Sequence, residues 1–412
     1  MKYLEDAKKA FRDKECEKAI ELYNKAIDNK EYEALSIIAM MYLTGFGVKQ
    51  DIDKGLDYLF LGDKKDDAES ISALGDYYYS GKYLNQDLSK AKAYYERAAK
   101  LLEPHAIGML GLFLFNEEKY SEAIEYFKSG AFYYDTNSMY YMAKCAYNGI
   151  GMNKDYELAF GLFSKLYDYN DSNKEIKKYL ADMYFNGFGT EQDFQKAKDL
   201  YIDLDDDESK FNLALIYKNH LKEYDKALEI FRSIKSVESQ FEQALMLYNG
   251  LGVEENKNDA YFKFYACAMS KYAYSYPFVG DCYYYGYGVK KDYLEAIKWY
   301  TLALEANIPN QNLNIGLSYL KLKKYDEAIT YLNKEVDSIN KFKALGEVYK
   351  MQKKKEESFN SFMNAAELND PEACFIVSKL LKKGKGTKKD KEKASFYYLR
   401  YVQLSTINDN EN

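Results

Sequence analysis

The chain has 412 residues, of which 47% are hydrophobic and 30% charged, and its formal net charge at pH 7 is −7. This composition excludes a disordered chain, and the longest apolar stretch, residues 107–115, is far too short to span a bilayer. The acidic balance argues against nucleic acid as a partner, because nucleic acids select for basic surfaces.

From the N-terminus onward, one pattern recurs in steps of 30 to 38 residues. Seven of its twelve units carry a glycine ten residues before an anchor position, and the other five have a shorter turn. The anchors are Ala19, Gly55, Ala91, Ala123, Ala159, Ala197, Ala227, Ala260, Ala296, Ala328, Ser358 and Ala394. A fixed period in this range is typical of a solenoid, in which each unit buries its apolar face against its neighbours.

Each glycine-bearing unit predicts two helices joined by a turn, as in residues 39–51 (AMMYLTGFGVKQD). A small residue six positions before the glycine allows a close helix crossing, and the glycine ends the first helix in the left-handed conformation. An aspartate six positions after it caps the second helix. The small residues are Ala39, Gly75, Ala143, Ala181, Ala244 and Gly280, and the caps are Asp51, Asp87, Asp155, Asp193, Asp292 and Asp390.

The pattern small–x–x–large–x–x–Gly–x–Gly–x4–Asp resembles the Sel1-like repeat. The shorter units, such as residues 117–127 (EEKYSEAIEYF), resemble the related tetratricopeptide repeat. The resemblance implies an all-α, right-handed superhelical solenoid of about twelve helix–turn–helix repeats over residues 1–405, with a polar tail at 406–412. The pattern departs late in the chain, where Ser358 replaces the anchor alanine and residues 350–357 (KMQKKKEE) lack the turn glycine.

The cysteines indicate a reducing compartment. Cys145 and Cys282 fall four residues before the repeat glycine, where other units have methionine, so we interpret them as small core residues rather than disulfide partners. The N-terminal residues 1–11 lack the apolar segment of a secretory signal. We therefore expect a cytoplasmic protein.

Signals for catalysis are weak, and we expect no catalytic residue, cofactor or metal. His105 and His220 are too far apart along a solenoid to share a site, and no zinc motif occurs. The Gly-x-Gly turns follow helices and lack the third glycine of a dinucleotide fingerprint. Some Sel1-like proteins are described as β-lactamases, but Ser-x-x-Lys at Ser89, Ser318 and Ser338 has neither Ser-Asp-Asn nor Lys-Thr-Gly beside it.

Two charge runs have both a functional and a structural interpretation. The acidic residues 203–208 could bind a cation or a basic partner, and the lysines of 350–355 could bind an anion. Runs of like charge are usually solvated, so we favour a solvated loop for the first and a solvated helix face for the second.

An aromatic stripe with periodic carboxylates is the best candidate site. An aromatic residue stands two positions before the glycine in five units, and an aspartate five positions before it in three. The residues are Tyr79, Tyr147, Phe185, Tyr248 and Tyr284, with Asp76, Asp182 and Asp281. In repeats of this kind the first-helix face lines the concave surface. The structural alternative is packing between units in a chain with 45 tyrosines.

These features together predict a non-enzymatic scaffold that binds a protein or peptide along the concave groove, without nucleic acid binding or membrane insertion. The aromatics would supply contact area, and the carboxylates would favour basic or hydrogen-bond-donating partners. Two alternatives stay open: a hydrolase by analogy with the described family members, and a secreted glycan-binding module, since tyrosine and aspartate also suit sugars.

Overall fold

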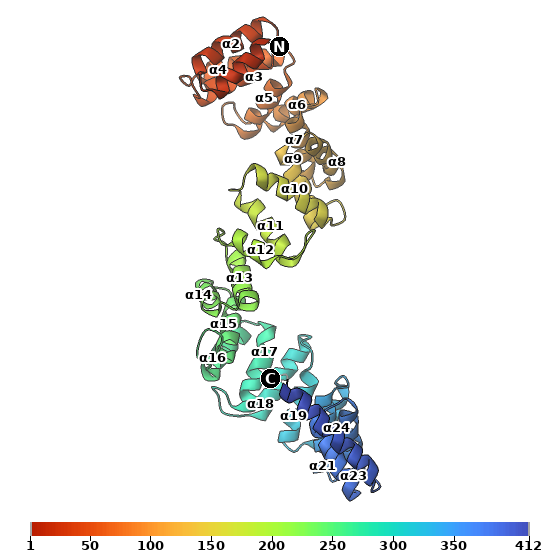
Figure 1. Ribbon diagram of the computed structural model, residues 1–412. Coiled ribbons are helices and arrows are strands. Elements are labelled where there is room, and N and C mark those ends of the chain that lie inside the picture. Colours follow the sequence, from red (N-terminus) through yellow and green to blue (C-terminus); the bar gives the residue numbers. More distant parts are fainter. Residues whose placement is uncertain (1, 411–412) are drawn as a thin grey trace. The chain divides into compact units, whose positions relative to one another are not determined.

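The computed structural model describes residues 2–410, with side chains from residue 3 to residue 406. The chain divides into two compact units, Met1–Asp205 and Asp206–Asn412, each a run of helix hairpins in chain order (Figure 1). Within the described residues, every regular element is a helix, which confirms the all-α prediction.

The first unit contains six hairpins, which we number 1 to 6. Their helices are α1 (Lys2–Arg12), α2 (Cys16–Asp28), α3 (Ala34–Thr44), α4 (Ile52–Lys64), α5 (Ala68–Ser80), α6 (Leu88–Lys100), α7 (Pro104–Asn116), α8 (Tyr120–Phe132), α9 (Thr136–Asn148), α10 (Tyr156–Tyr169), α11 (Lys174–Asn186) and α12 (Phe194–Tyr201).

The second unit contains hairpins 7 to 12. Their helices are α13 (Asp207–Ile216), α14 (Tyr224–Ser233), α15 (Val237–Asn249), α16 (Lys257–Met269), α17 (Tyr276–Tyr285), α18 (Tyr293–Glu305), α19 (Gln311–Lys321), α20 (Tyr325–Lys334), α21 (Ile339–Met351), α22 (Lys355–Glu367), α23 (Pro371–Lys383) and α24 (Lys391–Asn410). A π-helical turn (Tyr217–Leu221) follows α13, and a 3₁₀ turn (Ala273–Ser275) precedes α17.

Within each unit, hairpins pack against their sequence neighbours. The two helices of every hairpin contact each other, and each second helix contacts the first helix of the next hairpin in the same unit. First helices of neighbouring hairpins also touch, as α3 with α5, α7 with α9 and α19 with α21, whereas pairs of second helices have no comparable contact among the described residues. The first helices therefore lie closer together than the second helices.

The glycine turns have the predicted structure. Each of the seven glycines ends its helix at a positive φ, from 65° at Gly384 to 84° at Gly286. All six predicted aspartate caps accept hydrogen bonds from amides in the first turn of the following helix, as Asp51 does from the Lys54 amide at 3.0 Å. In hairpin 8, Asn256 takes the same role.

The five shorter hairpins turn without glycine. Each has an L-residue in the left-handed conformation between its helices: Lys14, Glu118, Lys222, Lys323 and Lys353. None of the five short turns thus contains a turn glycine, so its absence from residues 350–357 does not set hairpin 11 apart.

Close crossings at the small residues hold each hairpin together. Ala39, Ala143, Ala181 and Ala244 are fully buried, as predicted. At the glycine positions the fit is tighter still, because a Cβ on Gly75 would lie 2.7 Å from Cε1 of Tyr95. A large buried side chain four residues after the anchor therefore occupies the space that the small residue leaves free.

No helix within the described part of the chain is long and apolar enough to cross a membrane. Helix α24 extends to Asn410, so the placement of a polar tail from residue 406 and of one continuous solenoid over 1–405 stays a prediction.

Enlarging Ala181 tests the helix crossing. Ala181→Leu forces a larger side chain into a fully buried position, so we expect a stability loss of about 1–3 kcal/mol in thermal unfolding. Lys165→Leu, at an exposed position of the preceding helix α10, is the control and should change stability by less than about 0.5 kcal/mol. Equal melting temperatures for Ala181→Leu and the wild type would contradict the crossing.

Candidate functional site

The five predicted aromatic residues lie near the C-terminal ends of first helices and are half-buried. Three of them pack across to the next first helix. Tyr79 meets Phe113 at 5.8 Å between ring centroids, Tyr147 meets Tyr179 at 5.2 Å, and Tyr248 meets Phe278 at 6.2 Å. These rings hold neighbouring hairpins together, which is the contact that the structural alternative predicts.

The other two aromatics pack mainly within their own hairpins. Phe185 lies 5.8 Å from Phe194, and Tyr284 lies 5.4 Å from Tyr293, both in the following second helix. Burial raises the pKa of Tyr284 to about 12, so its hydroxyl stays protonated at neutral pH. The structure thus does not bring the five aromatics together as one cluster, and they line successive hairpins.

The three predicted carboxylates accept hydrogen bonds from buried tyrosines. Tyr95 donates to Asp76 at 2.7 Å, Tyr201 to Asp182 at 2.5 Å, and Tyr300 to Asp281 at 2.7 Å. Each tyrosine is 19 residues after its aspartate, in the second helix of the same hairpin. These tyrosines were not among the predicted site residues, although their constant spacing of 19 residues from the aspartates is visible in the sequence.

Burial explains why these pairs recur. The rings of Tyr95, Tyr201 and Tyr300 are at most 1% exposed, and a phenolic hydroxyl without a partner would cost free energy there. Burial also raises the pKa of Asp281, and the hydrogen bond from Tyr300 partly offsets that rise. These aspartates therefore have a structural role, whatever else they bind.

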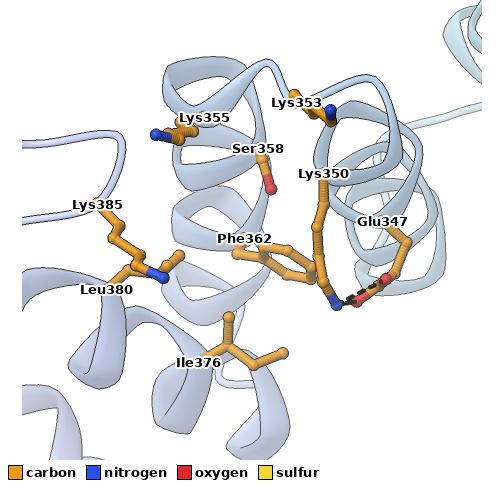
Figure 2. Close-up of a pocket in the computed structure, with 9 residues that line it drawn as sticks. All are labelled: Glu347, Lys350, Lys353, Lys355, Ser358, Phe362, Ile376, Leu380 and Lys385. Carbon is orange, nitrogen blue, oxygen red and sulfur yellow. Dashed lines mark hydrogen bonds and ion pairs between the residues drawn. The ribbon is translucent and has the colours of Figure 1, made fainter. Parts of the chain in front are cut away.

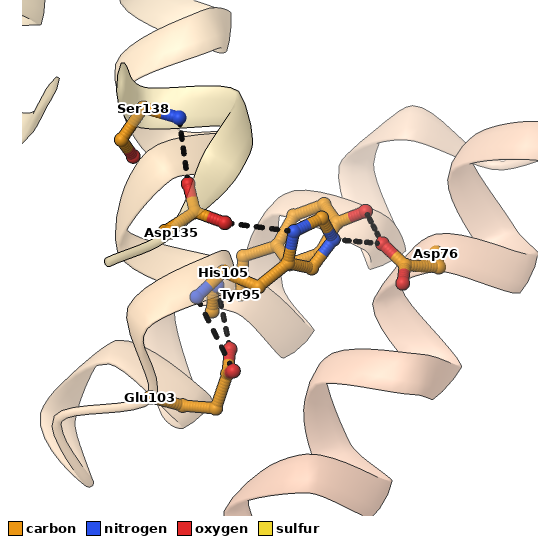
Figure 3. Close-up of polar contacts among 7 residues, drawn as sticks. Asp76, Tyr95, Glu103, His105, Asp135 and Ser138 are labelled. Atoms are coloured by element: carbon orange, nitrogen blue, oxygen red, sulfur yellow. Dashed lines mark hydrogen bonds and ion pairs between the residues drawn. The ribbon is translucent and has the colours of Figure 1, made fainter. Parts of the chain in front are cut away.

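One pair extends into a chain of polar contacts across three hairpins (Figure 3). Nε2 of His105, near the start of α7, lies 2.9 Å from Asp76, and its Nδ1 lies 3.6 Å from Asp135. Asp135 caps α9 by accepting from the Ser138 amide at 2.7 Å. Burial would lower the pKa of His105, but the hydrogen bonds and charges of Asp135 and Asp76 raise it to about 10. His105 is therefore a charged link between hairpins 3, 4 and 5.

A ring that the sequence analysis did not select is the most accessible aromatic near the stripe. Tyr285 directly precedes Gly286, where most other units have Thr, Ser or Asn. Its side chain is 53% exposed, and its ring stacks on Tyr287 at 5.4 Å and meets Tyr284 edge-on at 4.8 Å. The replacement of a polar residue by tyrosine was the available signal.

The acidic run and two of the three serine motifs have structural contacts. Lys177 and Lys174 pair with Asp203 and Asp205, and Asp206 caps α13, while these three aspartates stay exposed, as expected of a solvated loop. Ser318 donates to the Asn314 carbonyl, and Ser338 caps α21.

The described residues contain no group of three or more His, Cys, Asp or Glu placed to hold a metal ion. His105 and His220 lie in different units. Four of the five cysteines are buried and all five are free, and burial raises the pKa of Cys145 to about 11. These thiols have the environment of core residues.

Comparison with protein families shows to which family the chain belongs. The Sel1 repeat matches residues 6–30, 33–61, 68–101, 136–168, 179–202, 237–262, 268–308 and 371–400, more than half of the chain. The chain belongs to the Sel1 repeat family. The tetratricopeptide repeat matches residues 208–237 and 312–337, which are hairpins 7 and 10. Hairpin 1, which we likened to that repeat, matches the Sel1 repeat instead.

One solved structure supports the fold. A protective antigen of uropathogenic Escherichia coli strains, which displays an SLR fold, is 20% identical with a TM-score of 0.60, covering 95% of this chain and 90% of that one. A Sel1 repeat protein from Oxalobacter formigenes is 20% identical with a TM-score of 0.43, covering 56% of this chain and 98% of that one. No curated protein sequence matches the chain.

The three Asp–Tyr pairs all lie in hairpins that match the Sel1 repeat. Each Asp–Tyr pair lies inside a single Sel1 match, in hairpins 3, 6 and 9. Hairpins 4 and 11 lie outside every matched range.

Removing one buried hydroxyl tests the Asp–Tyr pairs. Tyr300→Phe leaves Asp281 without its donor, so we expect hairpin 9 to lose about 1–3 kcal/mol of stability in native-state hydrogen exchange. The control is Tyr23→Phe in hairpin 1, since Tyr23 occupies the matching buried position with no carboxylate acceptor among the described residues. Equal losses in the two variants would mean that the hydrogen bond is not the cause.

The charge of His105 makes stability depend on pH. Its folded pKa of about 10 lies above the unfolded value of about 6.5, so its contribution is complete below about pH 6.5 and is lost as pH rises through 10. We expect the stability difference between wild type and His105→Gln to shrink over this range. An NMR titration of the imidazole, assigned with His105→Gln, measures the pKa directly, and a midpoint near 6.5 would contradict the network.

Proposed function

We propose that this Sel1 repeat protein is a non-catalytic cytoplasmic scaffold that binds a protein or peptide partner. Its principal contact would be the surface of α15 and α17 around Tyr248, Asp281, Tyr284 and Tyr285, which we call the first-helix surface. Repeat solenoids of this family generally serve as protein-interaction scaffolds. The location and the partner chemistry are our inference.

The exposed ring of Tyr285 is the observation that carries this proposal. A tyrosine that is 53% exposed yet held between Tyr284 and Tyr287 loses little conformational freedom on binding. Aromatic residues of this kind supply much of the energy at protein interfaces. Tyr248 and Tyr284 are half-buried beneath this surface, so they support it more than they contact a partner.

The charge of Asp281 favours basic or hydrogen-bond-donating partners. Its negative charge contributes to the raised pKa values of Tyr248 and Tyr285, second to burial in each case. One of its oxygens is already bonded to Tyr300, so its position is fixed before any partner arrives. A preorganised charge of this type acts mainly on association rate and specificity.

The test compares two exposed aromatic residues, Tyr285 at the end of a first helix and Phe262 in a second helix. Full-length wild type, Tyr285→Ala and Phe262→Ala are used as baits in extracts of the native host, after circular dichroism shows that all are folded. Phe262 is 62% exposed on the second helix α16 and is the matched control. We expect Tyr285→Ala to weaken capture about thirtyfold, since an aromatic anchor is worth about 2 kcal/mol, and Phe262→Ala to leave it unchanged.

A third bait addresses charge. Asp281→Asn keeps an acceptor for Tyr300 but removes the negative charge, so capture of a basic partner should become slower and less sensitive to salt. If Tyr285→Ala and Phe262→Ala recover the same proteins equally well, the first-helix surface is not the binding site.

A further inference from the structure

Hairpin 11 differs from the other hairpins at the junction with hairpin 12. Three residues before the anchor, six hairpins have an aromatic residue, whereas hairpin 11 has Lys355. Between the two turn glycines, five of the other six glycine-bearing hairpins have an apolar residue, whereas hairpin 12 has Lys385. Of the seven junctions that precede a glycine turn, this is the one with lysine at both positions.

One other junction has aromatic rings at both of these positions. At the junction of hairpins 5 and 6, the rings of Tyr156 and Phe188 stack at 4.4 Å. The backbone contact is the same in hairpins 11 and 12, because a Cβ on Gly386 would lie 2.0 Å from the Lys355 carbonyl oxygen. The turn therefore sits as it does in hairpin 6, but lysines stand where that junction has its two rings.

Beside this turn lies a pocket of about 320 Å³, which we call the lysine-rimmed pocket (Figure 2). Its floor consists of Phe362, Ile376 and Leu380. Leu380 occupies the position four residues before the glycine, where Met or Cys is fully buried in five other hairpins, and here it is only partly buried. The pocket thus partly exposes Leu380, whose counterparts belong to the core in five other hairpins.

Four lysines surround the opening, and their charge is largely unopposed. Lys350 pairs with Glu347 at 2.9 Å. In the part of the chain that the structure describes, the ammonium groups of Lys353, Lys355 and Lys385 have no ion pair or hydrogen bond. Four lysines and one glutamate leave three positive charges around an apolar floor, in a chain whose net charge is −7.

We propose that the lysine-rimmed pocket binds an acidic peptide segment of a partner protein through one aromatic side chain. Six hairpins have an aromatic residue at the position of Lys355, and the aromatic ring of the peptide would supply such a ring here, in contact with Phe362, Ile376 and Leu380. Carboxylates on either side of it would reach the lysines. The pocket shares no residue with the first-helix surface, so this inference does not depend on the function proposed above.

Size and charge placement favour a peptide over a small organic anion. The volume is near the lower end of the range of about 300–1,000 Å³ for ligand pockets, which suits one inserted side chain. Figure 2 shows the lysines approaching from separate sides of the opening instead of converging on one point. A segment with several carboxylates can meet more of them than a single carboxylate can.

The test measures binding of fluorescein-labelled Glu-Glu-Phe-Glu-Glu to the full chain by fluorescence anisotropy, with Glu-Glu-Ala-Glu-Glu as the matched peptide. We expect saturable binding that weakens as salt rises and that falls about tenfold or more when Phe is replaced by Ala. Lys355→Glu with Lys385→Glu should weaken binding by a similar factor. Lys354→Glu, an exposed neighbour that does not line the pocket, should leave it within about twofold.

A second variant fills the pocket instead of reversing its charge. Lys355→Tyr with Lys385→Phe copies the stacked pair of hairpins 5 and 6, so it should raise the melting temperature and abolish peptide binding. Three results would overturn the proposal: no binding of the Phe peptide, equal binding of both peptides, or unchanged binding by the filled variant. Competition by phenylacetate as strong as by the peptide would assign the pocket to small aromatic acids instead.

Discussion

The fold depends on one close contact, made in most hairpins between a small residue of the first helix and a bulky side chain of the second. Gly280 against Tyr300 and Gly346 against Phe362 are examples in which a Cβ on the glycine would overlap the ring. This contact fixes the distance and rotation of the two helices. Since a hairpin can bury its remaining apolar faces only on its neighbours, the same geometry passes from one hairpin to the next within a unit.

In hairpins 3, 6 and 9 the bulky residue is a tyrosine that needs a hydrogen-bond partner, and the first helix supplies an aspartate one position after the small residue. Gly280 and Asp281 are adjacent for this reason, as are Gly75 and Asp76. Packing thus determines where the carboxylates of the candidate surface lie. In hairpin 3 the same carboxylate also binds His105, so a polar group needed inside one hairpin links it to the next two.

Local features could be predicted from the sequence, and contacts between elements could not. Helix ends, caps and crossing residues depend on side chains a few positions apart, so Gly45 and Asp51 were assigned correctly. Helical phase placed Asp281 on a face of its own helix, but its bond to Tyr300 depends on how two helices cross. The lysine-rimmed pocket lies where Lys355 and Lys385 replace residues that are aromatic or apolar in many other hairpins. From the sequence these lysines are visible only as departures from the repeat pattern, and the pocket beside them is not.

The turns between helices have a consequence for heat tolerance. Thirteen L-residues of the described chain have a positive φ, among them Lys14, Leu102 and Asn369. In residues other than Asn and Asp this conformation carries steric strain of about 1 kcal/mol that glycine would not. The strained residues lie at the bends between helices, so replacing them with glycine could raise the heat tolerance of single hairpins without repacking the core; Lys353 is the exception, because its side chain lines the lysine-rimmed pocket.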